Sequence, residues 1–330
     1  MRRTGRGSCA ALLLFAAGCR GVYSTLDPAT REAARITTLH WVMYWMCAAF
    51  FVAMMTVLAV AVSRQRRSET PEGDRRRSVS VAVAAGISTG LLLVLLAASV
   101  VTGHANVAPA GAKALEIEVI GHQWWWEVRY PARSSAHDVT TANEIHVPVG
   151  RAVRLQLSSG DVIHSFWVPN LHGKKDLIPG RRTSQVFHVE KEGTFRGQCA
   201  EFCGYQHAHM GLVVFAESPR LFEAWLDRQR RLASEPAGGA ERHGREVFLS
   251  SPCVLCHTIR GGGAFGHKAP DLTHLASRTT IASATLPNTP GHLAGWVTDP
   301  QSIKPGNRMP PNILAANDLD DLVSYLRSLR

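Results

Sequence analysis

The chain has 330 residues, seven of them cysteines, and a formal net charge of +10. Most of this charge lies in residues 1–112, which hold twelve arginines and five acidic residues. Because these arginines flank apolar segments instead of covering a folded basic domain, the charge pattern excludes a nucleic-acid-binding function. The length allows two or three domains.

The first residues have the pattern of an export signal. Arginines precede the apolar run 9–17, which is too short to span a bilayer, so residues 1–18 are predicted to be a signal peptide. Residues 16–19, Ala-Ala-Gly-Cys, resemble a lipoprotein cleavage box, which implies a lipid anchor on Cys19. An ordinary signal peptide and an uncleaved anchor remain the alternatives. Residues 19–39 would then form an extracytoplasmic N-terminal segment.

Two long apolar stretches follow, over residues 40–62 and 79–102. Each exceeds the roughly 20 residues that a helix needs to cross the hydrocarbon core. Residues 40–104 are therefore predicted to form a transmembrane helical hairpin. The segment between the stretches is rich in arginine, which the positive-inside rule places in the cytoplasm. Everything after residue 105 is therefore expected on the extracytoplasmic side.

Residues 113–218 change to an alternating pattern. Apolar and polar residues alternate in Leu115-Glu-Ile-Glu-Val119 and in Val153-Arg-Leu-Gln-Leu157. This pattern, broken by proline and glycine, is typical of short antiparallel strands. Many such strands predict a β-barrel or sandwich.

One short run in this region combines thiols, a thioether and imidazole. Soft sulfur ligands select copper, and imidazole completes such sites. Two thiolates in one loop can bridge two metal ions. The alternatives are a disulfide, which needs no neighbouring histidine or methionine, and a structural zinc site, which rarely uses a thioether. The donors in the run are Cys199, Cys203, His207 and Met210, and His164 supplies a second imidazole.

A second cofactor motif follows a predicted helix and linker over residues 219–243. Residues 253–257 read Cys-Val-Leu-Cys-His, which is the attachment signature of a c-type haem. Cys253 and Cys256 would form the thioethers and His257 would be an axial ligand, with a redox dithiol as the alternative.

The segment that holds this motif, residues 244–330, is predicted to be an all-α cytochrome c domain. Its last helix should pack on its first through an apolar stripe. A class I cytochrome c also needs a second axial ligand, for which Met309 is the prediction. A histidine–methionine pair raises the haem potential. The competing residues are His267, His274 and His292.

The run from Cys199 to Met210 resembles the binuclear copper A motif of subunit II of cytochrome c oxidase, in the haem–copper oxidase family. The resemblance implies a cupredoxin-like β-barrel for residues 113–218. It also implies that Glu201 binds copper through its backbone carbonyl, and that its carboxylate helps to hold magnesium at the interface with subunit I. The implied copper A ligands are His164, Cys199, Glu201, Cys203, His207 and Met210.

Three further segments carry the same resemblance. Residues 121–126 resemble the tryptophan-rich strand of the family, which implies that electrons reach the copper site through Trp124. Residues 175–181 resemble a segment that faces the catalytic subunit. Residues 23–36 resemble the N-terminal stretch of bacterial, cytochrome caa-type subunits II that carry a fused cytochrome c.

The resemblance implies a respiratory role for the chain. Electrons from an external donor such as a cytochrome c would pass to the covalent haem, then to copper A, and then to subunit I, which reduces oxygen to water. Oxygen chemistry would lie on subunit I, and subunit III is a further expected partner. The expected location is a bacterial inner membrane, with the copper and haem domains on the periplasmic side.

A membrane-anchored electron-transfer protein without an oxidase partner is the alternative function. Nitrous oxide reductase shares the copper motif, but it needs a large propeller domain for which the chain has no room. Quinol oxidase subunits keep the fold and lose the copper ligands, all of which are present in this sequence.

Overall fold

The computed structural model describes residues 23–64, 71–107, 111, 114–132 and 138–330. The predicted signal peptide and Cys19 lie outside the described residues. The chain forms two compact units. One consists of Ala34–Pro109, and the other combines Met1–Ala33 with Ala110–Arg330. Each unit is described by itself.

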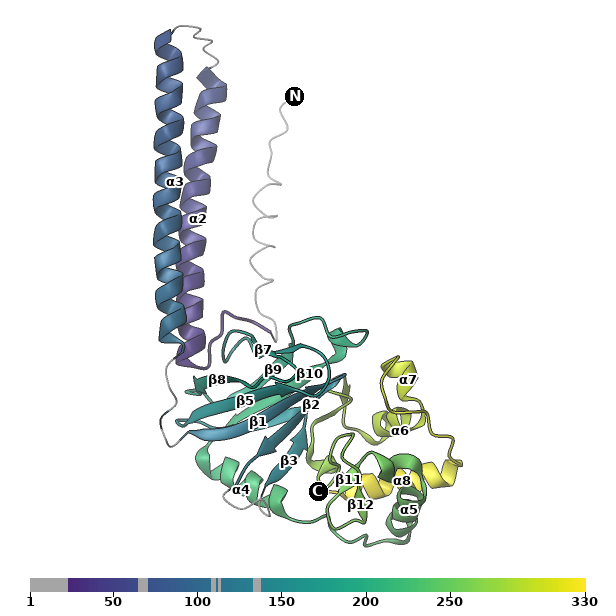
Figure 1. Ribbon diagram of the computed structural model, residues 1–330. Helices are drawn as coiled ribbons and strands as arrows, with labels where there is room; N and C mark the ends of the chain where they lie inside the picture. Colours follow the sequence, from purple (N-terminus) through teal and green to yellow (C-terminus); the bar gives the residue numbers. More distant parts are fainter. Residues whose placement is uncertain (1–22, 65–70, 108–110, 112–113, 133–137) are drawn as a thin grey trace, which may run out of the picture. The chain divides into compact units, whose positions relative to one another are not determined.

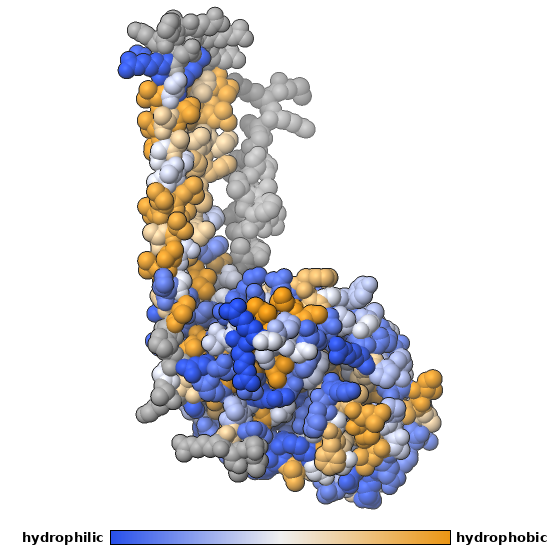
Figure 2. Space-filling view, viewed as in Figure 1, coloured by the Kyte–Doolittle hydropathy of each residue, from blue (hydrophilic) through white to orange (hydrophobic). Residues whose placement is uncertain are grey.

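The smaller unit is a pair of long helices (Figure 1), α2 (Arg31–Arg64) and α3 (Pro71–Ala105). Both are long and apolar enough to cross a membrane. Each is longer than its apolar stretch, because the polar residues at its ends continue the helix and Pro71 suits a first helical turn. Their large apolar side chains are exposed, and Figure 2 shows them covering the hairpin. Such a surface is stable in lipid and costly in water.

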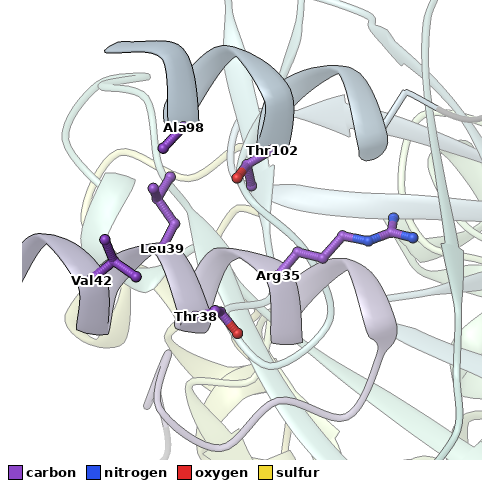
Figure 3. Close-up of a pocket in the computed structure, with 6 residues that line it drawn as sticks. All are labelled: Arg35, Thr38, Leu39, Val42, Ala98 and Thr102. Carbon is purple, nitrogen blue, oxygen red and sulfur yellow. The ribbon is translucent and has the colours of Figure 1, made fainter. Parts of the chain in front are cut away.

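A shallow pocket of about 250 Å³ lies between these two helices (Figure 3). Leu39 and Ala98 come from opposite helices, and Arg35 donates a hydrogen bond to the Ala105 carbonyl (2.8 Å). These contacts tie α2 to the end of α3. The lining residues are Arg35, Thr38, Leu39, Val42, Ala98 and Thr102.

The larger unit begins with a β-sandwich made of two five-stranded sheets. Buried side chains of both sheets, among them Ile117, Leu155 and Val214, form one core. The first sheet contains β3 (Val139–Ala142), β2 (Trp125–Tyr130), β1 (Leu115–His122), β5 (Ala152–Ser159) and β8 (Thr183–His188), in this order. The second contains β4 (Glu144–Pro148), β10 (Gly211–Glu217), β9 (Gly193–Cys199), β6 (His164–Trp167) and β7 (Lys175–Leu177). The predicted cupredoxin-like β fold is confirmed.

The alternating sequence pattern explains this sandwich. In β5, Val153, Leu155 and Leu157 are fully buried, whereas the residues between them are only partly buried. β1 runs parallel to β5 and antiparallel to β2, so its buried residues join the same core. A shift of one residue would expose every one of these side chains, so burial fixes the register.

A helix closes the sandwich and leads to the last domain. α4 (Pro219–Arg230) is capped by the Ser218 side chain, which accepts from the Leu221 amide. Its buried Trp225 stacks on His146 of β4, with ring centroids 4.0 Å apart. This aromatic contact anchors the start of the connection to the β domain.

The rest of the chain is a small helical domain. α5 (Gly239–Ser250) and α8 (Ala316–Ser328) cross at Gly244, where a Cβ would collide with the Asp321 carbonyl. Phe248 and Tyr325 meet edge to face across this crossing, so the predicted packing of the last helix on the first is confirmed. The other elements are η4 (Pro252–Leu255), η5 (Leu275–Ser277), α6 (Pro290–Thr298), α7 (Pro300–Ile303) and the hairpins β11 (Thr258–Ile259)–β12 (Ala264–Phe265) and β13 (Thr280–Ile281)–β14 (Leu286–Pro287).

Candidate metal centre

The predicted copper ligands are brought together by three neighbouring strands. Cys199 ends β9, Met210 immediately precedes β10, and the Cys199 amide donates to the Met210 carbonyl (2.9 Å). This bond closes the loop between the strands. β6 pairs with β9 and places His164 beside Cys199, while η3 (His207–His209) lies inside the loop.

The donor atoms of this cluster are spaced for metal binding. The Sγ atoms of Cys199 and Cys203 lie 3.8 Å apart, which matches two sulfurs on one tetrahedral metal with bonds of about 2.3 Å. His164 Nδ1 lies 3.9 Å from Cys199 Sγ, and His207 Nδ1 lies 3.6 Å from Cys203 Sγ. Met210 Sδ lies 3.9 Å from Cys203 Sγ. The cluster therefore offers two sulfurs in the middle and an imidazole at each side, which fits a pair of soft metal ions.

Glu201 offers two different oxygens to this site. Its backbone carbonyl lies 3.2 Å from Cys199 Sγ, within the metal cluster. Its carboxylate points elsewhere, 3.9 Å from the Lys174 ammonium, and is partly exposed. One residue can thus present a neutral oxygen to one metal and a charged oxygen to another.

The contact between the two thiols shifts their pKa values in opposite directions. The contact with Cys203, together with His164, lowers the pKa of Cys199 although burial opposes the shift. The same contact and burial raise the pKa of Cys203. Metals bind thiolates, so metal binding would release the proton that the pair retains.

An unpredicted carboxylate holds His164 in place. Asp161 Oδ1 lies 2.8 Å from His164 Nε2, which turns Nδ1 towards Cys199. The Gln123 amide donates to the other oxygen of Asp161 (2.7 Å). Metal-binding histidines commonly donate their second ring nitrogen to a carboxylate. The position of Asp161, three residues before His164, was the sequence signal that could have predicted this contact.

The tryptophan-rich segment contacts the metal loop directly. The Trp124 indole donates to the Cys203 carbonyl (3.0 Å), and the Trp126 indole donates to the Met210 carbonyl (3.3 Å). Trp126 is fully buried in the core of the β-sandwich. Trp125 instead is only partly buried and stacks on His122. Trp124 is only 8% exposed.

The haem-attachment motif occupies the turn after α5. Cys253 lies in η4, Cys256 follows it, and both thiols are free. His257 is partly buried, and its Nδ1 lies 2.7 Å from the Pro270 carbonyl. This bond fixes the tautomer and leaves Nε2 as the available ligand. Burial also lowers the pKa of His257, which keeps the imidazole neutral for binding iron.

Apolar side chains around this motif suit a haem. Leu255 of η4 and Phe265 of β12, a strand that packs against η4, are 71% and 72% exposed. A bound macrocycle offers apolar surface for such side chains to cover. The residues present therefore fit a covalently attached c-type haem.

The loop 304–310 contains Met309 and is called the methionine loop. Its backbone is held by Gln301. The Gln301 amide donates to the carbonyls of Asn307 and Met309, both at 2.8 Å. The competing histidines have other partners. His274 Nε2 lies 3.1 Å from the Arg231 carbonyl, and His292 Nδ1 lies 2.7 Å from Thr289 Oγ1. His267 Nδ1 lies 3.4 Å from Thr258 Oγ1. Met309 as the second axial ligand stays a prediction.

Comparison with known proteins agrees with both centres. Residues 132–217 match the family described as Cytochrome C oxidase subunit II, periplasmic domain, and residues 242–330 match Cytochrome c. Cytochrome c oxidase subunit 2 of Alkalihalophilus pseudofirmus is 31% identical over 97% of this chain and 95% of its own length. The chain belongs to the cytochrome c oxidase subunit II family.

Other members of the subunit II family are similar. Cytochrome c oxidase subunit 2 of Bacillus subtilis is 27% identical over 96% of this chain and 95% of its own length. The crystal structure of the periplasmic domain of subunit II from Bradyrhizobium japonicum is 32% identical, with a TM-score of 0.34, and covers 38% of this chain and 96% of its own.

Membership in the subunit II family establishes the setting of the two centres. The chain is a subunit of a haem–copper oxidase, an oxidoreductase complex, and has an electron-transfer role in it. It associates with subunit I. Its two domain families are those of copper A and haem c. The two apolar helices are consistent with a membrane-anchored protein with a periplasmic domain.

Proposed function

We propose that this subunit receives electrons at its own covalent haem c and delivers them through a binuclear copper A centre to subunit I, which reduces oxygen to water. The observation that carries the proposal is the donor geometry of the loop 199–210, with two cysteine sulfurs 3.8 Å apart and an imidazole nitrogen within 3.9 Å of each. When bound, the haem iron and the copper pair each change oxidation state by one electron. The proposed copper ligands are His164, Cys199, Glu201, Cys203, His207 and Met210.

The haem would be held by the C-terminal domain. Cys253 and Cys256 would form the thioethers, while His257 and Met309 would be the axial ligands. The Pro270 carbonyl orients His257, and Gln301 restrains the backbone of Met309. A histidine–methionine pair gives a higher potential than other common ligand pairs, which suits an acceptor of electrons from a soluble cytochrome c.

Trp124 is the proposed point at which electrons enter the copper site. Its indole N–H is bonded to the carbonyl of Cys203, one of the two central ligands. The ring thus links the surface of the β domain to the metal loop through one hydrogen bond. This position supports the role that the family resemblance implies.

The surface that faces subunit I would lie near Glu201. Its carboxylate is available for magnesium, because hard oxygen ligands suit that ion and the side chain is partly exposed. Residues 175–181, which resemble a segment that faces the catalytic subunit, would contribute to the same contact. Subunit III is a further proposed partner.

The proposed location is a bacterial inner membrane. The arginine-rich segment between the helices would lie in the cytoplasm, and both β and haem domains would lie in the periplasm. Cys19 would carry the lipid anchor after removal of residues 1–18.

Purification of the full-length chain in mild detergent tests the proposed function. An affinity tag on its C-terminus should recover a complex that contains subunit I and its non-covalent haems, with a mixed-valence copper signal in the EPR spectrum. Recovery of the chain alone, loaded with copper and haem c, would support a free-standing electron carrier instead. A chain without the mixed-valence signal would contradict the copper assignment.

A further inference from the structure

The methionine loop of the cytochrome domain lies against the copper domain, and a buried lysine joins them. Lys304 is only 3% exposed. Its ammonium donates to the carbonyls of Trp124 (2.9 Å) and His209 (2.9 Å), which belong to the copper domain. It also reaches the carbonyl of Ala282 (3.3 Å) in the cytochrome domain. Three acceptors match the three protons of the ammonium group.

A lysine in this position requires its three partners. A buried charge without partners is strongly unfavourable. Burial lowers the pKa of Lys304 to about 7, while the nearby Cys203 opposes the shift, and hydrogen bonds to carbonyls favour the protonated form. The three carbonyls that bind Lys304 form what we call the carbonyl cage. Two of them belong to the copper domain and one to the cytochrome domain, so the cage exists only when the two domains are in contact. Lys304 therefore links its own burial to domain docking.

The residues after Lys304 continue the contact. The Gln206 side chain donates to the Pro305 carbonyl (2.8 Å). A Cβ added to Gly306 would come within 3.8 Å of the Trp124 ring. The Arg308 guanidinium lies 3.7 Å from the carboxylate of Asp161, which orients His164. The segment 304–308 thus covers Trp124 and ends one residue before Met309.

A second segment of the cytochrome domain fixes the cage from the other side. The Gly211 amide donates to the Ser283 carbonyl (3.1 Å), and the Ser283 hydroxyl donates to the Gly211 carbonyl (2.8 Å). The Thr279 amide and hydroxyl donate to the buried carboxylate of Glu144 (2.7 and 2.6 Å). Ala282, Ser283 and Ala284 have φ angles of 53°, 60° and 58°, which non-glycine residues adopt only when their surroundings compensate.

We propose that Lys304 is a positioning residue that fastens the methionine loop of the cytochrome domain over Trp124, so that the internal cytochrome occupies the face through which electrons enter the copper domain. This proposal rests on the proposed function, in which Trp124 is the point of electron entry. Its geometry rests on the hydrogen bonds of Lys304. An external donor must then deliver its electrons to the cytochrome domain, because the segment 304–308 covers Trp124.

Chemical labelling of the unmodified, full-length protein tests the docking itself. A lysine-acetylating reagent at limiting dose, followed by peptide mass spectrometry, should modify Lys304 at least about tenfold more slowly than the exposed Lys191, because labelling needs the domains to open. Equal rates would overturn the proposal. The result does not depend on whether subunit I co-purifies, so failure here is distinguishable from failure of the proposed function.

The variant Lys304→Met tests the positioning role, with Lys191→Met as the matched control. Methionine keeps the length of the side chain and removes the ammonium. In Lys304→Met, the Gly211 amide, which is bonded across the interface to Ser283, should exchange its hydrogen at least about tenfold faster. Copper reduction by the internal cytochrome should slow, with an unchanged copper EPR spectrum. Unchanged exchange and unchanged kinetics would overturn the proposal.

A second variant covers the case in which Lys304→Met does not fold. Thr279→Val removes the hydroxyl that donates to Glu144 and leaves Lys304 in place. Acetylation of Lys304 should become faster in this variant, while that of Lys191 stays constant. If Lys304 stays as protected as in the unmodified protein, the contact between Thr279 and Glu144 does not hold the carbonyl cage. The proposal that both segments of the cytochrome domain fasten it to the copper domain would then be wrong.

Discussion

Asp161 shows how a single residue outside the proposed copper ligands can set the orientation of one of them. Its carboxylate contacts His164 Nε2 at 2.8 Å and accepts from the Gln123 amide at 2.7 Å. Burial by itself would raise the pKa of Asp161, but the bonds to His164 and to backbone amides outweigh it and lower the pKa. The residue is therefore an anion that keeps the proton of His164 on Nε2 and leaves Nδ1 for metal.

Asp161→Asn should weaken copper binding by about 10- to 100-fold, the usual effect of removing such a carboxylate. Competition with a copper chelator on the full-length protein measures this change. Asp227→Asn is the control, because Asp227 is exposed on α4 and pairs only with Arg230 in the described contacts. Equal affinities for the two variants would show that His164 needs no orienting carboxylate.

Met309→Leu should block reduction of copper by the haem and leave the copper content unchanged. Loss of the thioether ligand lowers the haem potential, so the external donor can no longer reduce the haem and no electron passes on to copper. The methionine of the copper cluster is Met210, whose Sδ lies 3.9 Å from Cys203 Sγ. Rapid-mixing absorbance spectroscopy follows both centres, and metal analysis gives the copper content. Copper reduction at the rate of the unmodified protein would rule out Met309 as the axial ligand.

At the scale of elements, the crossing of α5 and α8 determines whether the haem domain is stable. Gly244 allows the two helices to touch, because any Cβ there would collide with the Asp321 carbonyl. Gly244→Ala should therefore lower the free energy of unfolding of this domain by about 1–3 kcal/mol, the usual cost of overpacking. Denaturant unfolding followed in the haem absorption band measures the change.

Gly239→Ala is the matched control for this prediction. Gly239 begins the same helix, and a Cβ there meets nothing within 4 Å. Its replacement should be neutral or slightly stabilising, because alanine favours a helix. If both variants lose the same stability, helix propensity and not the crossing accounts for the effect.

A histidine on the same helix makes this packing dependent on pH. His243 Nδ1 lies 2.8 Å from Asp321 of α8. The bond to Asp321, with the nearby Asp318, raises the pKa of His243 above 6.5. A histidine whose pKa is raised by folding stabilises the protein fully below its unfolded pKa, and this contribution disappears as the pH rises through the raised value.

His243→Gln should therefore lower the melting temperature of the haem domain most at a pH below 6.5, and the difference should vanish in alkaline solution. Thermal unfolding of both proteins across a pH series, followed by circular dichroism, measures it. A difference that stays constant across the series would mean that charge on His243 does not stabilise the helix pair.

The elements and ligands that depend on local sequence were predictable. The strands β1 and β5 follow from alternation over a few residues, and the donors of the loop 199–210 and of the haem motif lie within short runs. Helix ends were less predictable. The arginines before residue 79 continue α3 back to Pro71, since charged residues near the end of a membrane helix remain helical while reaching water.

Residues whose roles depend on distant partners were not predictable. Lys304 reads as an ordinary loop lysine, yet its Trp124 partner lies 180 positions away in the chain. Glu144 likewise looks like a surface residue of an alternating strand, but Thr279, 135 positions later, makes it a buried acceptor. Only tertiary structure brings these pairs together, because nothing in either local segment encodes the other.

At the scale of the whole molecule, a membrane hairpin, a copper domain and a haem domain follow one another along one chain. In the proposed electron path, fusion of the haem domain to the copper domain removes the diffusional encounter, since the donor is present at a fixed effective concentration. Electron transfer between the domains should then be insensitive to ionic strength, unlike transfer from a separate protein steered by charge.

The most direct test is photoreduction of the haem c in the complete, detergent-solubilised oxidase, with absorbance recorded for both centres. The account predicts that copper A is reduced as the haem is oxidised, in a first-order process whose rate does not change with protein concentration or added salt. Copper reduction that requires a soluble cytochrome c and rises with its concentration would contradict the account.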